Sequence, residues 1–204
     1  MPSRYARTAL VLAVATVVGV GGGIGVAIAR DHSGERAASP LHAQATWSGK
    51  RAAPFRLRDE AGGTVSMAAL KGRVVLLTFL DSRCRSQCPV EGSMLAALGR
   101  RLGPKAGVEL LSVSVDPWAD TSASARAFAA KAHWTLPWHW LLGSPSQLRP
   151  VWASYAESVK RTKADILHTL LLYVIDRRGY QRAAYLFPIS PTEVAADVRS
   201  IAAT

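Results

Sequence analysis

The chain has 204 residues, which is enough for a short leader and one domain but excludes two large domains. Hydrophobic residues make up 49% of the sequence and charged residues 19%, so the chain can build a core and is not disordered throughout. The 25 lysines and arginines against 14 acids give a net charge of +11, which fits nucleic acid, anionic lipid or an acidic protein as a partner without choosing among them.

An apolar segment opens the chain. Residues 8–29 contain no charged side chain, and Arg4 and Arg7 precede them. At about 1.5 Å per residue, a helix of this length crosses a hydrocarbon core of about 30 Å. We therefore predict a membrane anchor, or alternatively a signal peptide, over residues 1–30 and a tether over residues 31–50. The protein would be a single-pass protein of the inner (cytoplasmic) membrane, with its domain on the extracytoplasmic, periplasmic side.

The domain predicted over residues 51–204 alternates strands and helices. Strands are expected as a hairpin at 55–57 and 64–67, as buried strands at 74–79 and 108–115, and as a second hairpin at 170–176 and 181–187. Helices are expected to begin near Pro89, Thr121, Pro145 and Pro191. Because strand and helix alternate, we predict a parallel crossover and an α/β fold of thioredoxin type with an N-terminal hairpin.

Two cysteines lie where the strand at 74–79 gives way to the next helix. Cys84 and Cys88 are four residues apart, so both sulfurs can turn to the same side and either form a disulfide or share a metal ion. Free amides at the helix start and the neighbouring Arg83 and Arg85 favour thiolates, so we expect lowered pKa values for both thiols. A purely structural disulfide is an alternative, although so short a loop adds little stability.

The donor types favour copper over zinc. A closed zinc site normally takes four protein ligands, whereas this chain has only two cysteines, and soft thiolates with an imidazole suit Cu(I). Among the five histidines, His168 is the best third ligand because it precedes the strand expected from residue 170. A lone histidine beside an apolar strand is also typical of a core residue, and the residue types alone do not decide.

Other polar and aromatic residues have simpler interpretations. Trp134, Trp138 and Trp140, which alternate with His133 and His139, are interpreted as core or loop anchors rather than as part of a metal site. After the strand at 108–115, Asp116 and Asp120 are expected to serve turn and helix-cap geometry.

The ordered motifs resemble the Sco/SenC family. They are the strand at 74–79, Cys-x-x-x-Cys-Pro-Val-Glu at 84–91, Ser-Val-Ser-Val-Asp-Pro at 112–117, His168, and Tyr-Val-Ile-Asp at 173–176 with Gly179. The resemblance spans about residues 55–180, and the combination is more specific than any one motif. It implies a membrane-anchored, thioredoxin-like protein that binds copper, as Cu(I) or Cu(II), through Cys84, Cys88 and His168.

The resemblance also implies a role in assembling an oxidase. The protein would deliver copper to the binuclear copper site of cytochrome c oxidase subunit II, or reduce the cysteines of that site through Cys84 and Cys88. A second copper chaperone or a thiol reductant would be a further partner. The chain departs from the family in having Leu167 where Asp often precedes the histidine, and Asp81 and Arg83 before the first cysteine. These departures bear on copper affinity and transfer rate rather than on the ligand set.

A thioredoxin-type thiol–disulfide oxidoreductase is the main alternative, with Cys84 as the exposed attacking thiol and Cys88 as its partner. Such enzymes typically have CxxC and a cis proline before the facing strand, whereas this chain has CxxxC and no proline between Pro150 and Pro188. A peroxidase resembling peroxiredoxins is a weaker alternative than the oxidoreductase, because the CxxxC spacing is foreign to peroxiredoxins.

Nucleic acid is not expected as a partner, because the arginines are scattered along the chain. A positive face could instead steer the domain toward an acidic protein or the anionic membrane surface.

Overall fold

The computed structural model describes residues 40–163 and 165–204. The anchor predicted over residues 1–30 and residues 31–39 of the predicted tether lie outside these described residues. Within the described part, no helix combines the length and the apolar character needed to cross a membrane.

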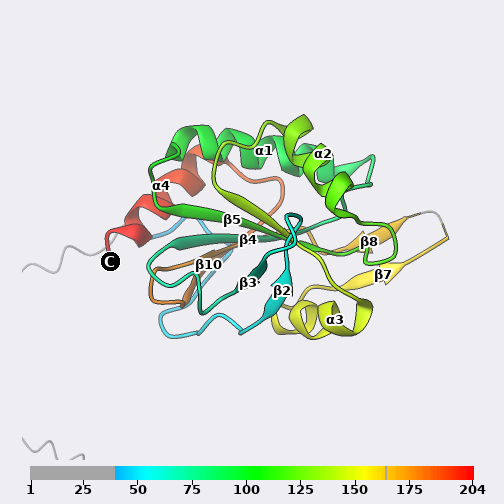
Figure 1. The fold of residues 1–204 in the computed structure, drawn as a ribbon. Coiled ribbons are helices and arrows are strands. Elements are labelled where there is room, and N and C mark those ends of the chain that lie inside the picture. Colours follow the sequence, from blue (N-terminus) through cyan, green and yellow to red (C-terminus); the bar gives the residue numbers. More distant parts are fainter. Residues whose placement is uncertain (1–39, 164) are drawn as a thin grey trace, which may run out of the picture. The chain divides into compact units, whose positions relative to one another are not determined.

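A mixed sheet forms the centre of the described domain (Figure 1). Its strand order is β1-β10-β9-β4-β5-β6, with bounds β1 (Ala45–Thr46), β10 (Gln181–Leu186), β9 (Leu171–Ile175), β4 (Val74–Leu80), β5 (Val108–Ser114) and β6 (Trp138–Leu141). Strands β4, β5 and β6 run parallel, whereas β9 is antiparallel to β4 and β10 to β9. The predicted parallel crossover and C-terminal hairpin are confirmed.

Both faces of this sheet are covered. Helices α1 (Gln87–Leu102), α2 (Ser122–Ala132) and α4 (Pro191–Ala202) pack on one face, and α3 (Pro145–Ser154) with the hairpin β2 (Arg56–Arg58) and β3 (Thr64–Ser66) packs on the other (Figure 1). Every residue of β4 is therefore buried. Val74, Leu76 and Leu80 face the layer of α1, α2 and α4, and Val75, Leu77 and Phe79 face the layer of α3 and the β2–β3 hairpin. Cover on both faces explains the continuous apolar run in the sequence.

Several short elements were not predicted. Strand β6 belongs to the Trp-rich segment, where Trp134 and Trp140 stack on each other and contact Phe128 in the core. A small hairpin, β7 (Val159–Arg161) and β8 (Ile166–His168), precedes β9. Its three-residue strands carry exposed polar residues and show no clear alternation.

The predicted tether also overlaps the fold at its C-terminal end. Ala45 and Thr46 form β1 and pair with Ala184 and Ala183, and the carbonyl of Lys50 accepts a hydrogen bond from the Gln181 amide. The domain therefore begins before residue 51. A two-residue strand is too short for a hydrophobic pattern, so this pairing could not be predicted from the sequence.

The strand directions decide where the functional residues gather. The Cys84 loop follows the carboxyl end of β4, and Asp116 follows the carboxyl end of the parallel neighbour β5. Strand β9 starts beside the end of β4, because Leu172 pairs with Thr78. His168, just before β9, is thereby brought to the same edge of the sheet as the cysteines.

Candidate metal and redox site

The two cysteines occupy different environments on one turn of chain. Cys84 is half-buried in the loop after β4, and its amide donates a hydrogen bond to the Asp81 carbonyl. Cys88 is fully buried in the first turn of α1. Both are free thiols, so the structure shows the reduced form of the pair.

His168 faces Cys88 across the sheet edge. Its Nε2 atom lies 3.6 Å from Cys88 Sγ, although the two residues are 80 positions apart. The other ring nitrogen, Nδ1, lies 3.0 Å from the Thr169 carbonyl oxygen, which can only accept a hydrogen bond. The proton therefore belongs on Nδ1, and the Nε2 lone pair points at the thiol, which is the orientation that a metal ligand needs.

The two thiols differ in acidity. A hydrogen bond from Cys88 lowers the pKa of Cys84 to about 4, and Ser86, with its hydroxyl 3.5 Å from Cys84 Sγ, acts in the same direction. The same hydrogen bond and burial raise the pKa of Cys88. The prediction of two acidic thiols is therefore correct for Cys84 and wrong for Cys88, because only one sulfur of a hydrogen-bonded pair can be the acceptor.

Two buried carboxyl groups complete the surroundings of His168, and the sequence analysis missed both. Glu157 Oε1 lies 3.6 Å from His168 Nδ1, and their side chains are 0% and 4% exposed. Burial raises the pKa of Glu91 to about 7, although the charge of His168 opposes the shift. Burial alone would lower the pKa of His168, but the carboxylates of Glu157 and Glu91 outweigh burial and raise it. Glu91 had a sequence signal, since it lies three residues after Cys88 on one helix face.

Asp120 anchors the cysteine loop. Its Oδ1 accepts hydrogen bonds from the Ser82 amide, at 2.9 Å, and from the Ser82 hydroxyl, while Oδ2 accepts from the Ser114 hydroxyl at the end of β5. The cap of α2 is Thr121, so the expectation of a cap role for Asp120 is wrong. Asp116 does serve the predicted turn, because its Oδ1 accepts from the Trp118 amide.

This anchor predicts a pH dependence of stability. Burial raises the pKa of Asp120 from 3.8 to about 6, although hydrogen bonds from Ser114 and Ser82 lower it. Because the folded state holds this proton more tightly, the contribution of Asp120 is complete below about pH 4 and is lost as the pH rises through about 6. We expect the fall in unfolding free energy between about pH 4 and 7 to be shallower in Asp120→Asn, as measured by urea unfolding. The exposed Asp165→Asn is the control, and an unchanged slope in Asp120→Asn would contradict the assignment.

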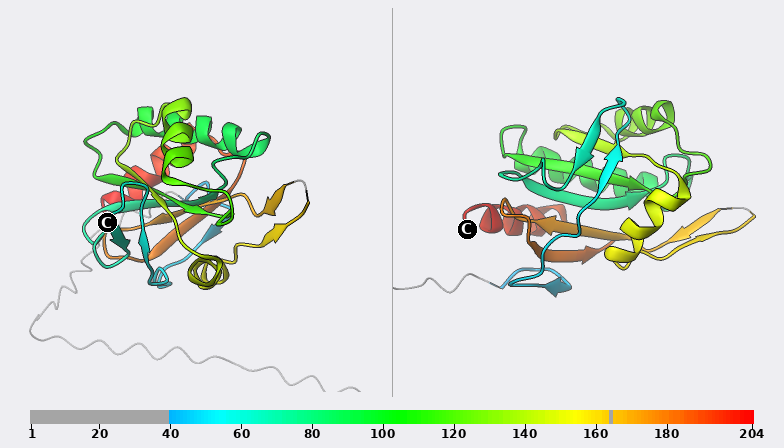
Figure 2. Two further views of the ribbon diagram at one scale, coloured as in Figure 1. Left: turned by 45° about the vertical axis from the view of Figure 1, so that its right-hand side comes forward. Right: turned by 60° about the horizontal axis from the view of Figure 1, so that its bottom comes forward.

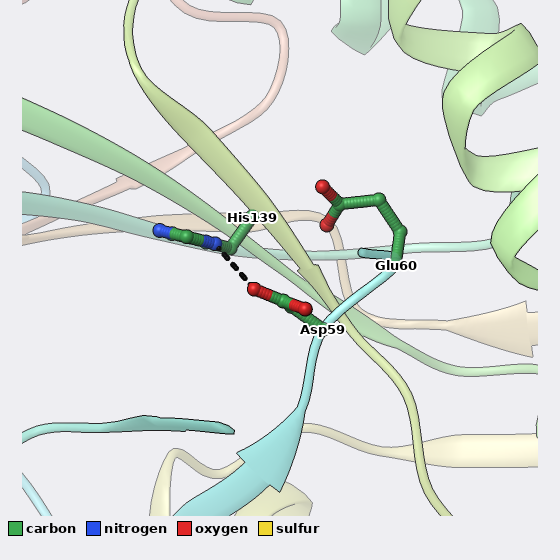
Figure 3. A group of neighbouring side chains, drawn as sticks. All are labelled: Asp59, Glu60 and His139. Atoms are coloured by element: carbon green, nitrogen blue, oxygen red, sulfur yellow. Dashed lines mark hydrogen bonds and ion pairs between the residues drawn. The ribbon is translucent and has the colours of Figure 1, made fainter. Parts of the chain in front are cut away.

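A second group of metal-ligating types lies away from the cysteines (Figure 3). Asp59, Glu60 and His139 offer atoms within 4.8 Å of one another. Each is already engaged in the fold: His139 Nδ1 contacts Asp59 Oδ2 at 2.9 Å, His139 Nε2 contacts Glu109 at 3.2 Å, and Glu60 accepts from the Trp140 amide at 2.8 Å. We interpret this group as the polar attachment of the β2–β3 turn to edge strand β6, in line with the packing role predicted for the Trp-rich segment.

Known proteins provide an independent comparison. A SCO1 protein homolog of Bacillus subtilis (strain 168) is 28% identical over 132 residues, which cover 62% of this chain and 68% of that protein. A chloroplastic peroxiredoxin Q of Triticum aestivum is also 28% identical, over 134 residues that cover 64% of this chain and 55% of that protein. Peroxiredoxins are thus relatives as well, although the cysteine spacing fits them less well.

Solved structures and a family model extend the comparison. The structure of Bradyrhizobium japonicum ScoI with copper bound superimposes with a TM-score of 0.65 at 30% identity, covering 75% of this chain and 99% of that one. This similarity confirms the predicted thioredoxin-like fold. The family model described as SCO1/SenC matches residues 44–203. This match covers the whole site from Cys84 to His168, and the chain therefore belongs to the SCO1/SenC family.

Proposed function

We propose that the reduced protein binds copper through Cys84, Cys88 and His168 and delivers it to the binuclear copper site of cytochrome c oxidase subunit II. The observation that carries this proposal is the 3.6 Å approach of His168 Nε2 to Cys88 Sγ, with Cys84 hydrogen-bonded to the same thiol. The copper-bound ScoI structure supports the choice of metal, because that protein belongs to the same family.

The donor set fits Cu(I). Two sulfurs and one imidazole are soft or intermediate ligands, and Cu(I) accepts such low coordination. Cys84 is already a thiolate, and the Thr169 carbonyl holds the Nδ1 proton of His168 so that Nε2 is free to bind. Cys88 must lose its proton when copper binds. Copper affinity should therefore rise with pH.

Oxidation of the cysteines would control copper release. When the copper-bound thiolates of Cys84 and Cys88 form a disulfide, the pair gives up two electrons and no proton, and neither sulfur is a thiolate any longer. A disulfide in the acceptor protein could take up those electrons. Copper release and thiol oxidation would then be two results of one step.

A thiol reductase activity is the second candidate, and the unequal acidity of the two cysteines favours it. The Cys84 thiolate would attack a partner disulfide, forming a mixed disulfide and releasing one partner thiolate. Cys88 would then lose its proton and attack Cys84 Sγ, releasing the second partner thiol. This reaction leaves the Cys84–Cys88 disulfide and a reduced partner.

We also propose that residues 1–30 anchor the protein in the inner membrane, with the domain on the periplasmic side. The uncharged segment at 8–29 supports this placement. The periplasm is oxidising, so a disulfide between Cys84 and Cys88 could form and persist in that compartment.

The deciding experiment is an anaerobic Cu(I) titration of the reduced protein against a competing chelator. We expect one tightly bound copper per chain, and its release when the cysteines are oxidised quantitatively. Absence of tight binding would overturn the copper proposal and leave the reductase as the function to pursue. Tight retention of Cu(I) after disulfide formation would overturn the redox control alone.

A further inference from the structure

Exposed apolar side chains gather beside the site. Among the described residues, the large apolar side chains that are exposed are Val90, Trp118, Leu167 and Leu186. Two of these four lie near the cysteines: Val90 follows Cys88 by two residues, and Trp118, in the loop after β5, lines a cleft together with Arg83. Single exposed apolar residues are ordinary, but an exposed tryptophan that lines a cleft beside a reactive centre is typical of a binding surface.

Positive charge surrounds the same residues. Arg83 and Arg85 flank Cys84, and the β7–β8 hairpin carries Lys160, Arg161 and Lys163, all of them exposed. None of these five cations makes an ion pair within the part of the chain that the structure describes. Asp165 is the one exposed acid described on the same segments, and the buried Asp81 and Asp116 line the cleft between them. The exposed side chains beside the cysteines therefore carry an excess of positive charge.

The segments form one continuous surface. A cleft of about 250 Å³ is lined by residues of the cysteine loop, the loop after β5 and the β7–β8 hairpin, including Arg83, Trp118, Arg161 and Lys163. The Arg161 guanidinium lies 4.8 Å from the centre of the Trp118 ring, so the hairpin and the loop are in contact. Figure 2 shows the hairpin projecting from the body of the domain in both views. The cleft is lined from one face of this hairpin, because Arg161 pairs with Ile166 there, whereas the neighbouring pair Lys160 and Leu167 points to the opposite face.

We infer that this surface docks an acidic face of the protein that accepts copper or electrons from the site. We define the docking surface as Arg83, Arg85, Trp118, Arg161 and Lys163. Carboxylates on the partner would meet its cations and steer association, while Trp118 would supply apolar contact at the cleft. An arginine stacked on a tryptophan is a frequent centre of binding energy in protein interfaces. The inference rests on the proposed function, because it takes the partner to be the acceptor.

The test measures association of the reduced, copper-free protein with the soluble copper-binding domain of cytochrome c oxidase subunit II. The double variant Arg161→Glu/Lys163→Glu should slow association by about 10-fold or more at low salt and lose most of the salt dependence. The matched control is Lys105→Glu/Arg149→Glu, with the same charge change at other exposed positions.

Several results would overturn the inference. Equal effects of the double variant and its matched control would show that only net charge matters. Absence of association with the domain would exclude this partner, and binding of the cations to anionic vesicles instead would assign the surface to lipid. A separate Cu(I) titration of each variant distinguishes this failure from failure of the proposed function, since docking variants should keep the copper affinity of the parent protein.

Discussion

Replacing His168 with alanine is expected to lower the Cu(I) affinity of the reduced protein by about 100-fold or more. Loss of residues that only orient a ligand already costs about 10- to 100-fold in metal affinity, and loss of the ligand itself should cost at least as much. The imidazole faces Cys88 Sγ at 3.6 Å and is held by Thr169, so no other described histidine can take its position without rebuilding this edge of the sheet. The measurement is Cu(I) competition with a chelator under anaerobic conditions.

His42→Ala is the matched control for this prediction. His42 also pairs with a carboxylate, Asp197 at 2.8 Å, but lies on a different part of the domain. It should leave the Cu(I) affinity unchanged. Because the His168 side chain is buried, urea unfolding of His168→Ala must show that the variant still folds. A folded His168→Ala protein with Cu(I) affinity close to that of the parent would remove His168 from the ligand set.

Replacing Cys88 with alanine is expected to raise the pKa of Cys84 from about 4 to above about 7, because the largest cause of its acidity is the hydrogen bond from Cys88. At pH 5 most Cys84 is a thiolate in the parent protein, whereas about 1% would be in the variant. The thiolate fraction of Cys84 that is available for alkylation at pH 5 should therefore fall by on the order of 100-fold, and the alkylation rate should fall by less, because a thiolate of higher pKa is more nucleophilic. The pH profile of the alkylation rate gives both pKa values directly.

Cys88→Ser is the informative companion, because its hydroxyl can still donate to Cys84. It should keep the pKa of Cys84 well below that in Cys88→Ala. If alanine and serine at position 88 gave the same profile as the parent, the acidity of Cys84 would have to come from the helix start and its neighbouring arginines, as the sequence alone suggested.

Much of this fold could be predicted because its central elements have strong patterns. Strand β4 is a continuous apolar run bounded by a turn, and α2 and α3 begin directly after Thr121 and Ser144, which cap them. The elements that were missed are short and depend on tertiary pairing: β7 and β8 stabilise each other, and β1 exists only because β10 offers a free edge. Local preference carries little information for strands of two or three residues.

The site was predictable to the level of residues but not of their interactions. The ordered motifs placed Cys84, Cys88 and His168 in one family pattern, and strand directions explain why they meet. The division of acidity between the thiols depends on which sulfur α1 buries, and that is a property of packing. The role of Glu157 could not be predicted either, because it also depends on tertiary structure. The β7–β8 hairpin between Glu157 and His168 brings the two side chains together.

The 80 positions that separate Cys88 from His168 also affect the order of events during biogenesis. An unfolded chain holds its two cysteines together locally but keeps the histidine far away, because closing a long loop costs conformational entropy. The proposed three-ligand set exists only after β9 has paired with β4. If copper is held as proposed, newly made chains would thus bind it tightly only once their sheet is complete, and misfolded chains would remain without metal.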